Sequence, residues 1–307
     1  MNISIHKASV SEQLQADKNS HSTWGKEQSL DDYLAQCETS VRRKKAQGWV
    51  LTLDGTVVSS LGCHDLQFHL AGEIVDGFGL ASVHTRDDMR KRGFADRLCQ
   101  HVIAQQRSKN KRIGLLFSDI NPTYYENMGF ALHSQNSHDC QPLTGLINSG
   151  PKAILNPLEP TREVAWLQAA YTLFHANSKC ALARSQEYWS YSILANPENV
   201  FWSIVQSHQR VGYVRIAKAD DLWAIVECVI NTTERPEALR CDVHRQIAAL
   251  AQQAKVSLLT SWQQPPSAIQ VHYVQRKRSK AWPMLMLQAP CTENDLGDIP
   301  IYVSDYF

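Results

Sequence analysis

Residues 80–130 constrain the fold more than any other part of this 307-residue chain. An apolar run at 80–85 precedes a basic turn at 90–95, and apolar side chains then recur at helical spacing to about residue 110. A second apolar run occupies 113–118. Because β-branched residues in the first run favour a strand, this order predicts a strand–helix–strand crossover. The chain is therefore expected to be an α/β protein.

The turn between the first strand and the helix has the composition of an anion site. Gly93 lets backbone N–H groups approach a ligand closely. The first N–H groups of a helix have no partner inside it and attract negative charge. Arg90, Lys91 and Arg92 add three cations, and such side chains bind phosphate oxygens. We therefore predict phosphate binding here, with a solvated basic loop as the alternative for the turn taken alone.

Together with a Tyr-x-x-x-Gly-Phe sequence after the second strand, these residues resemble the GNAT superfamily of N-acetyltransferases. The family signature Arg/Gln-x-x-Gly-x-Gly/Ala reads Arg90-Lys91-Arg92-Gly93-Phe94-Ala95, and Tyr125-Glu126-Asn127-Met128-Gly129-Phe130 matches the family's helix and Gly-Phe ending. The resemblance covers most of residues 1–140. It implies an α/β (α+β) acyl-CoA N-acyltransferase fold, with a mixed central sheet flanked by helices. It also implies acetyl-CoA as co-substrate and no metal.

The resemblance implies a role for each matching residue. Backbone groups of Val83 and Thr85 would pair with the pantetheine arm of acetyl-CoA. Main-chain N–H groups of residues 92–95 would hold the pyrophosphate. Ser118 would lie where its strand separates from its neighbour to admit the cofactor. Tyr125 would be the general acid that protonates the departing CoA thiolate.

The proton acceptor is less defined, because an attacking amine must first become neutral. Glu73, Asp76 and His84 are candidates near the first strand, and a solvated surface position is the alternative for each. The carboxylate of Phe307 is a further candidate, since a C-terminal carboxylate serves as base in some aminoglycoside-acetylating relatives. A bound water is the remaining possibility.

The N-terminal part predicts a strand at Ile3–Ile5, then a helix over residues 9–18 that Ser9 caps. Ser29 begins a second helix that continues into a charged run at 41–45. Residues 49–61 predict a hairpin, because two apolar runs flank Asp54-Gly55.

Trp24-Gly25 and the residues before Tyr125 are similar to fungal lysine N6-acetyltransferases. In many GNAT proteins this N-terminal region shapes the acceptor pocket. A packing role for Trp24 is the alternative.

The C-terminal half predicts a second domain. We expect a catalytic domain over residues 1–141, a linker rich in proline and glycine over 142–163, and a second domain over 164–307. The expected helices cover 164–174, 185–194 and 236–255, and the expected strands cover 200–205, 211–216, 222–230, 257–259 and 284–287. This order resembles a degenerate GNAT-like domain without the basic turn. Such a domain would be non-catalytic and would either shape the substrate site or serve as a scaffold.

Composition narrows the functional class. The net charge is +1, so no basic field attracts nucleic acid, and no apolar run is long enough to span a membrane. The eight cysteines show no Cys-x-x-Cys pair, and the N-terminus is not a signal peptide, which favours the cytoplasm. We therefore expect acetyl transfer to the primary amine of a small molecule such as lysine. A peptide or protein acetyltransferase and a non-catalytic acetyl-CoA sensor are the alternatives, and the oligomeric state is open.

Overall fold

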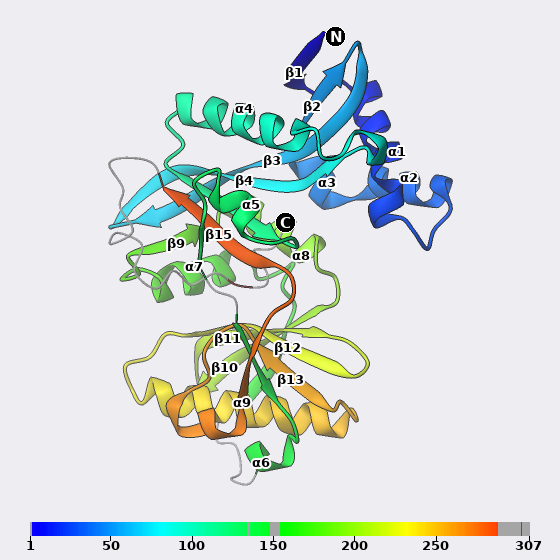
Figure 1. Cartoon of the computed structure of the whole chain (residues 1–307). Coiled ribbons are helices and arrows are strands. Elements are labelled where there is room, and N and C mark those ends of the chain that lie inside the picture. Colours follow the sequence, from blue (N-terminus) through cyan, green and yellow to red (C-terminus); the bar gives the residue numbers. More distant parts are fainter. Residues whose placement is uncertain (1, 134–135, 148–153, 288–301, 303–307) are drawn as a thin grey trace. The chain divides into compact units, whose positions relative to one another are not determined.

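The computed structural model describes residues 2–133, 136–147, 154–287 and 302, which divide into two compact units. Of these residues, 2–133 and 282–287 belong to unit 1, and the others belong to unit 2. Each unit is built around its own β-sheet (Figure 1).

Unit 1 contains the N-terminal elements and one strand from near the C-terminus. Its elements are β1 (Ile3–Lys7), α1 (Val10–Trp24), α2 (Leu30–Thr39), α3 (Val41–Lys45), β2 (Gln47–Leu53), β3 (Thr56–Leu70), β4 (Glu73–Thr85), α4 (Phe94–Ser108), β5 (Ile113–Ser118), α5 (Thr123–Glu126), β6 (Ala131–Leu132) and β15 (Trp282–Leu287). The strands follow the order β1-β2-β3-β4-β5-β15-β6. The sheet is mixed, because β4 and β5 are parallel whereas β3 and β4 are antiparallel.

Strand alternation in β2 explains why helices cover both faces of this sheet. Trp49 and Leu51 point into a core that contains the apolar side of α4. Val50, between them, points to the opposite face and packs against Ala16 of α1. All three β2 side chains are buried, so the strand is apolar on both faces as expected for a central strand.

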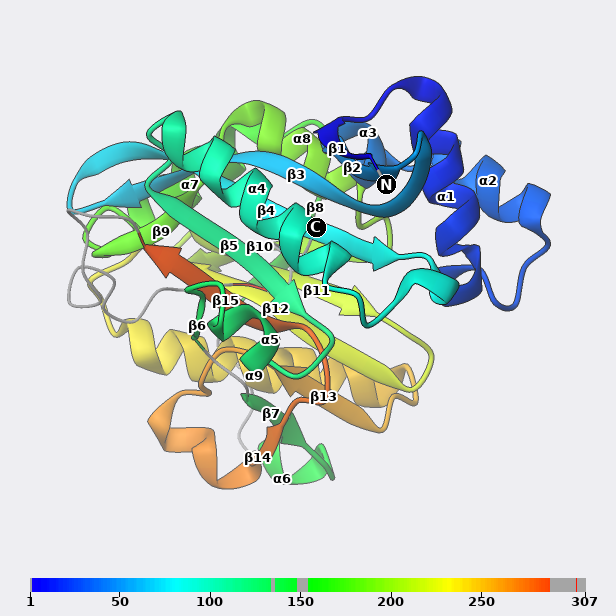
Figure 2. The ribbon, with the colours of Figure 1, turned by 45° about the horizontal axis from the view of Figure 1, so that its top comes forward.

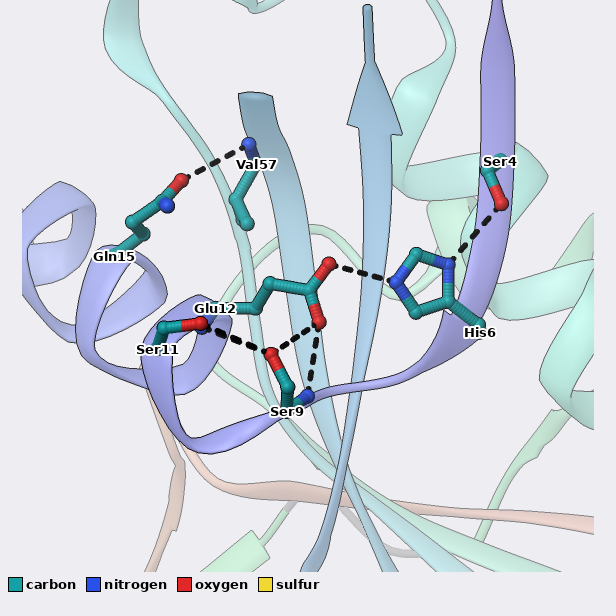
Figure 3. A network of polar contacts seen from close by, with 7 residues as sticks. All are labelled: Ser4, His6, Ser9, Ser11, Glu12, Gln15 and Val57. Carbon is teal, nitrogen blue, oxygen red and sulfur yellow. Dashed lines mark hydrogen bonds and ion pairs between the residues drawn. The ribbon is translucent and has the colours of Figure 1, made fainter. Parts of the chain in front are cut away.

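The start of α1 shows how local sequence fixes a helix (Figure 3). Ser9 caps the helix by accepting the N–H of Glu12 at 3.3 Å, and Glu12 Oε2 accepts the N–H of Ser9 at 2.9 Å. These reciprocal bonds form a capping box. Glu12 Oε1 also lies 2.7 Å from His6 Nε2, which joins the helix to β1.

Most of the expected N-terminal elements are confirmed. The β1 strand, the capped start of α1 and the hairpin of β2 and β3 are present, and Asp54 and Gly55 both have positive φ at the hairpin turn. The prediction of one continuous second helix is wrong. A break at Ser40 separates α2 from α3, because Ser40 has an extended ψ and its side chain accepts the N–H of Arg43 to start a new helix.

Unit 2 contains the remaining elements. They are β7 (Asn136–Cys140), α6 (Thr144–Ile147), β8 (Ile154–Leu158), α7 (Val164–Phe174), β9 (Cys180–Ala183), α8 (Gln186–Leu194), β10 (Asn199–Gln206), β11 (Gln209–Lys218), β12 (Leu222–Ile230), α9 (Pro236–Gln253), β13 (Leu258–Ser261) and β14 (Val274–Lys277). Its sheet follows the order β14-β7-β13-β12-β11-β10-β8. The predicted helices and strands between residues 164 and 261 are confirmed, with end shifts of a few residues.

A buried ionic cluster lies on one face of the unit 2 sheet. Glu227 Oε1 is 2.7 Å from Arg184 and 3.6 Å from Arg215, and all three side chains are completely inaccessible. Tyr213 donates its hydroxyl to Glu227 Oε2 at 2.7 Å. The Arg184 guanidinium also lies 4.2 Å from the ring centroid of Tyr171. The Glu227 carboxylate is thus paired with two guanidinium groups and one hydroxyl in the interior of unit 2.

The chain organisation differs from the expected boundaries in three places. β7 was expected to belong to the catalytic domain, but it lies in unit 2 and pairs with β13 and β14. Residues 142–163 were expected to be a linker, but they contain α6 and β8, and β8 pairs with β10 inside the unit 2 sheet. The strand expected at 284–287 is β15, which pairs with β5 of unit 1 rather than joining the C-terminal sheet. These differences come from pairing between distant segments, which the proline and glycine content of a sequence does not predict.

Candidate functional site

The parallel strands β4 and β5 separate before they end. Their pairing covers Gly77–Leu80 on β4 and Ile113–Leu116 on β5. β4 continues for five further residues to Thr85, and β5 continues to Ser118. The resulting opening is where the resemblance implies that the cofactor arm enters.

A bulge lies on β4 inside this opening. The register with β3 passes from Ala81–Gly62 to His84–Ser60, so β4 carries one extra residue, and Ser82 has φ of 51°. Val83 then packs against the α4 side of the core. The Thr85 hydroxyl lies 3.1 Å from that of Ser59. Because of the extra residue, the β4 side chains after the bulge point to the opposite face of the sheet from the one they would reach in a regular strand.

The turn after β4 presents backbone donors. Gly93 is the N-cap of α4, with φ of 75° and no side-chain cap on the helix. No described residue accepts the backbone N–H groups of residues 92–96, as expected for a helix start without a cap. A Cβ built on Gly93 would meet nothing within 4 Å, so the space beside the turn is open. The turn therefore has the geometry of an anion cradle.

The three basic side chains of the turn differ in their contacts. Arg90 forms an ion pair with Asp87 at 2.6 Å, and it donates to the Thr85 carbonyl at 3.2 Å and to Thr23 at 3.1 Å. Lys91 and Arg92 are exposed, and neither has a hydrogen bond or ion pair with another described residue. Arg90 thus holds the turn in place, whereas Lys91 and Arg92 are available to a phosphate.

Ser118 ends β5 and shapes the loop that follows it. Its side chain is 1% exposed. The hydroxyl donates to the carbonyl of Ile120 at 2.8 Å and accepts that residue's N–H at 3.3 Å. Ser118 lies two residues beyond the last β4–β5 pair, and its hydroxyl forms its hydrogen bonds within this turn.

Tyr125 lies on α5, directly after this loop. Its ring meets Phe130 edge-on at 6.3 Å, and its carbonyl accepts the N–H groups of Met128 at 3.0 Å and Phe130 at 3.1 Å. Gly129 has φ of 93°, which lets the chain turn back so that Phe130 can pack on Tyr125. This geometry explains the Tyr-x-x-x-Gly-Phe spacing physically.

The Tyr125 side chain is buried among apolar and aromatic neighbours. It is 8% exposed, and burial raises its pKa above the ordinary value of 10.0. The phenol therefore stays protonated at neutral pH. No described residue forms a hydrogen bond with the Tyr125 hydroxyl.

The structure separates the candidate proton acceptors. Glu73 and Asp76 are exposed at the start of β4, and Glu73 faces Arg112 at 3.8 Å. Because a strand advances about 3.3 Å per residue, they lie far along β4 from the turn. His84 is at the other end of β4, next to the turn, and is 4% exposed. Phe307 lies outside the described residues.

Sequence analysis did not identify the contacts that join the end of α1 to this site. Thr23 receives the Arg90 hydrogen bond, and the Trp24 ring lies 5.6 Å from the ring of His84. Only the half-exposed Trp24 gave a signal in the sequence, through its similarity to an acceptor loop.

The residues of this arrangement lie within a stretch of the chain that matches a known domain family. Residues 5–133 match the family model described as an acetyltransferase (GNAT) domain. The N-terminal unit contains a GNAT domain. The match includes the β4 opening, the turn at Gly93 and the Tyr125 motif, and it ends before the first element of unit 2.

Solved structures share the fold of the whole chain at low identity. A probable N-acyltransferase from Enterococcus faecalis has a TM-score of 0.74 at 11% identity, over 94% of this chain and 73% of its own. A GCN5-related N-acetyltransferase from Anabaena variabilis has a TM-score of 0.72 at 16% identity, over 92% and 72%. A tandem GNAT protein from the clavulanic acid biosynthesis pathway has a TM-score of 0.53 at 12% identity, over 95% and 100%. No curated protein matches the sequence.

These likenesses confirm the GNAT fold, including a tandem relative, and the expected two-domain layout is consistent with them. The resemblance to fungal lysine acetyltransferases is not supported by any comparison and stays a hypothesis. No helix among the described residues is long and apolar enough to cross a membrane. Within the same residues, no group of three His, Cys, Asp or Glu side chains is placed to hold a metal.

Proposed function

We propose that this protein is an acetyl-CoA-dependent N-acetyltransferase that moves the acetyl group directly to the primary amine of a small molecule, with lysine as the first candidate. The supporting observation is that one domain contains both an uncapped α4 N-terminus and a protonated Tyr125 on α5. Both lie in the matched GNAT domain.

Different residues of the GNAT domain would bind acetyl-CoA and donate the proton. The N–H groups of residues 92–95, with Lys91 and Arg92, would bind the pyrophosphate of acetyl-CoA. Backbone groups of Val83 and Thr85 would pair with the pantetheine arm, as an added strand does. Tyr125 would give its proton to the thiolate when the C–S bond breaks.

Unit 2 would support the reaction without performing it. Its strand–helix–strand unit begins α9 with Pro236, which has no N–H to offer an anion. We assign it a shaping or scaffold role, which leaves the single set of catalytic groups in unit 1.

Adjacent tyrosines allow a matched test. Thiol release from acetyl-CoA would be followed with L-lysine, spermidine, kanamycin, single amino acids and a lysine peptide. Tyr125→Phe is expected to lower kcat by about 10²–10⁴-fold, while the Kd for acetyl-CoA by calorimetry stays within about twofold. Tyr124→Phe is the control, because the Tyr124 hydroxyl is buried without a partner and its loss should leave kcat within about threefold.

The outcomes separate the candidate functions. Turnover on one small amine that Tyr125→Phe abolishes supports the proposal. Turnover only on the lysine peptide would replace it with a peptide acetyltransferase. Tight binding of acetyl-CoA with no turnover on any amine would indicate a sensor.

A further inference from the structure

His84 has a buried ring nitrogen that forms no hydrogen bond with any described residue. The side chain is 4% exposed, and its Nε2 is buried without a hydrogen-bond partner among the described residues. Its backbone is fixed, because the His84 carbonyl accepts the Ser59 hydroxyl at 2.8 Å. A buried polar atom without a partner is unfavourable and rare in folded proteins, so it calls for an explanation.

A half-exposed aromatic ring lies against this histidine. Trp24 is the last residue of α1 and is 48% exposed, and its ring lies 5.6 Å from that of His84 at an angle of 56°. The two residues come from elements that meet where β4 ends, as Figure 2 shows. Trp24 therefore stands between solvent and one side of the imidazole.

The pair is tied to the anion turn. Thr23, next to Trp24, accepts the Arg90 hydrogen bond at 3.1 Å, and Arg90 also donates to the carbonyl of Thr85 at 3.2 Å. The end of α1, the end of β4 and the start of the turn thus form one connected structure.

The surroundings of His84 keep it neutral. Burial lowers the pKa of its imidazole below 6.5, and Arg90 lowers it further, while Asp87 opposes them. A neutral imidazole can accept a proton at pH 7, which a protonated one cannot. Glu73 and Asp76, the other candidates on β4, lack any such enclosure.

Resting on the proposed acetyl transfer, we propose that Trp24 and His84 form the acceptor site, in which the indole receives an alkylammonium group and His84 accepts its proton. The face of an indole attracts cations. Because Nε2 is buried, this binding mode requires the Trp24 ring to move when the amine binds. The acceptor is then a primary amine carried on a flexible chain.

The proton and bond changes balance. The ammonium gives one proton to His84, and the neutral nitrogen attacks the thioester carbonyl carbon. The new C–N bond forms, the C–S bond breaks, and the thiolate takes the proton of Tyr125. The amide nitrogen returns its second proton to the Tyr125 oxygen, and His84 releases the first to solvent.

The test combines His84 and Trp24 variants with the amine that wild type acetylates. His84→Ala is expected to lower kcat by about 10²–10⁴-fold, with free imidazole restoring part of it, and the Kd for acetyl-CoA is expected to stay within about twofold. Trp24→Ala is expected to raise the KM for the amine on the order of tenfold, and Trp24→Phe less, with the KM for acetyl-CoA unchanged. His69→Gln, on β3 opposite Ile74 near the start of β4, is the control and should match wild type.

The pH profile separates catalysis from structure. In wild type, kcat/KM should fall below the lowered pKa of His84, and this inflection should be absent in His84→Gln. Wild-type turnover with an unchanged profile in His84→Gln, or no imidazole effect in a folded His84→Ala, would overturn this inference alone. Absence of wild-type turnover on every amine would overturn the proposed function, and this inference with it.

Discussion

Units 1 and 2 each contain one pair of parallel strands that a helix connects. The two connecting helices, α4 and α9, start with different residues. In unit 1, Gly77–Leu80 pairs with Ile113–Leu116, and in unit 2, Leu222–Ile225 pairs with Leu258–Ser261. In both, the first strand runs on past the pairing and carries a bulge against its other neighbour. The sheet geometry that opens two strands is thus common to both.

The helix starts differ in charge and in free donors. α4 begins at Gly93 behind three cations and leaves its first N–H groups without acceptors in the described protein. α9 begins at Pro236, which has no N–H, after Arg235 with φ of 49°, and Glu237 lies in its first turn. Both first turns contain a carboxylate, Asp96 in α4 and Glu237 in α9, so the two starts differ in the three cations and the N–H groups of the α4 turn. Of the two helix starts, that of α4 is therefore the one suited to an anion.

The residues that follow the two bulges differ as well. In unit 1 the bulge leads to His84, whose Nε2 has no partner among the described residues. In unit 2 it leads to Glu227, which two arginines and Tyr213 enclose. One bulge thus leads to a polar group without a partner among the described residues, and the other leads to a carboxylate inside a buried ion-pair cluster.

The largest effect is expected at Glu227. Glu227→Gln would leave two arginines buried without their charge partner, which should lower the free energy of unfolding by about 3–5 kcal/mol. Urea denaturation measures this. Glu163→Gln is the control, since it breaks a partly exposed pair with Arg210 and should cost less than about 1 kcal/mol. Equal losses in the two variants would show that the buried cluster is not a stabilising feature of unit 2.

The next effect concerns the turn of unit 1. Gly93→Val should weaken acetyl-CoA binding at least about tenfold, because the left-handed φ of 75° strains a β-branched residue and the Cβ enters the cradle. Calorimetry measures the Kd. Gly72→Val carries similar strain at φ of 88°, also with open space around its Cβ, and should keep the affinity. Equal loss of affinity in both variants would attribute the effect to stability rather than to the turn.

A smaller effect concerns the start of α1. This helix has a side-chain cap, whereas α4 has none. Hydrogen bonds from Ser9 lower the pKa of Glu12 from 4.5 to about 2. Because the carboxylate is favoured in the folded state, its contribution is complete above pH 4.5 and is lost as the pH falls toward 2. Glu12→Gln should cost about 1 kcal/mol at pH 7 and little at pH 2. Denaturation at both pH values tests this, and the same cost at both would rule out the charge as its source.

The smallest effect is expected at the start of α9. Arg235→Gly should relieve the positive φ and raise stability by about 0.5–1 kcal/mol, offset in part by the entropy of glycine. Thermal unfolding measures the gain. The variant should leave acetyl-CoA binding unchanged, since Pro236 still withholds an N–H, and any new binding site in unit 2 would contradict the comparison of the two helix starts.

The sequence by itself determined the local features of this protein. The Ser9 cap, the Asp54-Gly55 hairpin, the helix start at Gly93 and the Tyr125 motif are all written in neighbouring residues, and each has the predicted structure. Their interactions span only a few positions, so residue type and spacing are sufficient to specify them.

Only the tertiary structure decided the rest. β15 joins β5 across more than half of the chain, and β8 turns an expected linker into a sheet strand. The burial of His84 against Trp24 and the enclosure of Glu227 likewise depend on which elements meet. The physical reason is that pairing and burial between distant segments depend on the packing of whole elements, which a pattern of neighbouring residues does not encode.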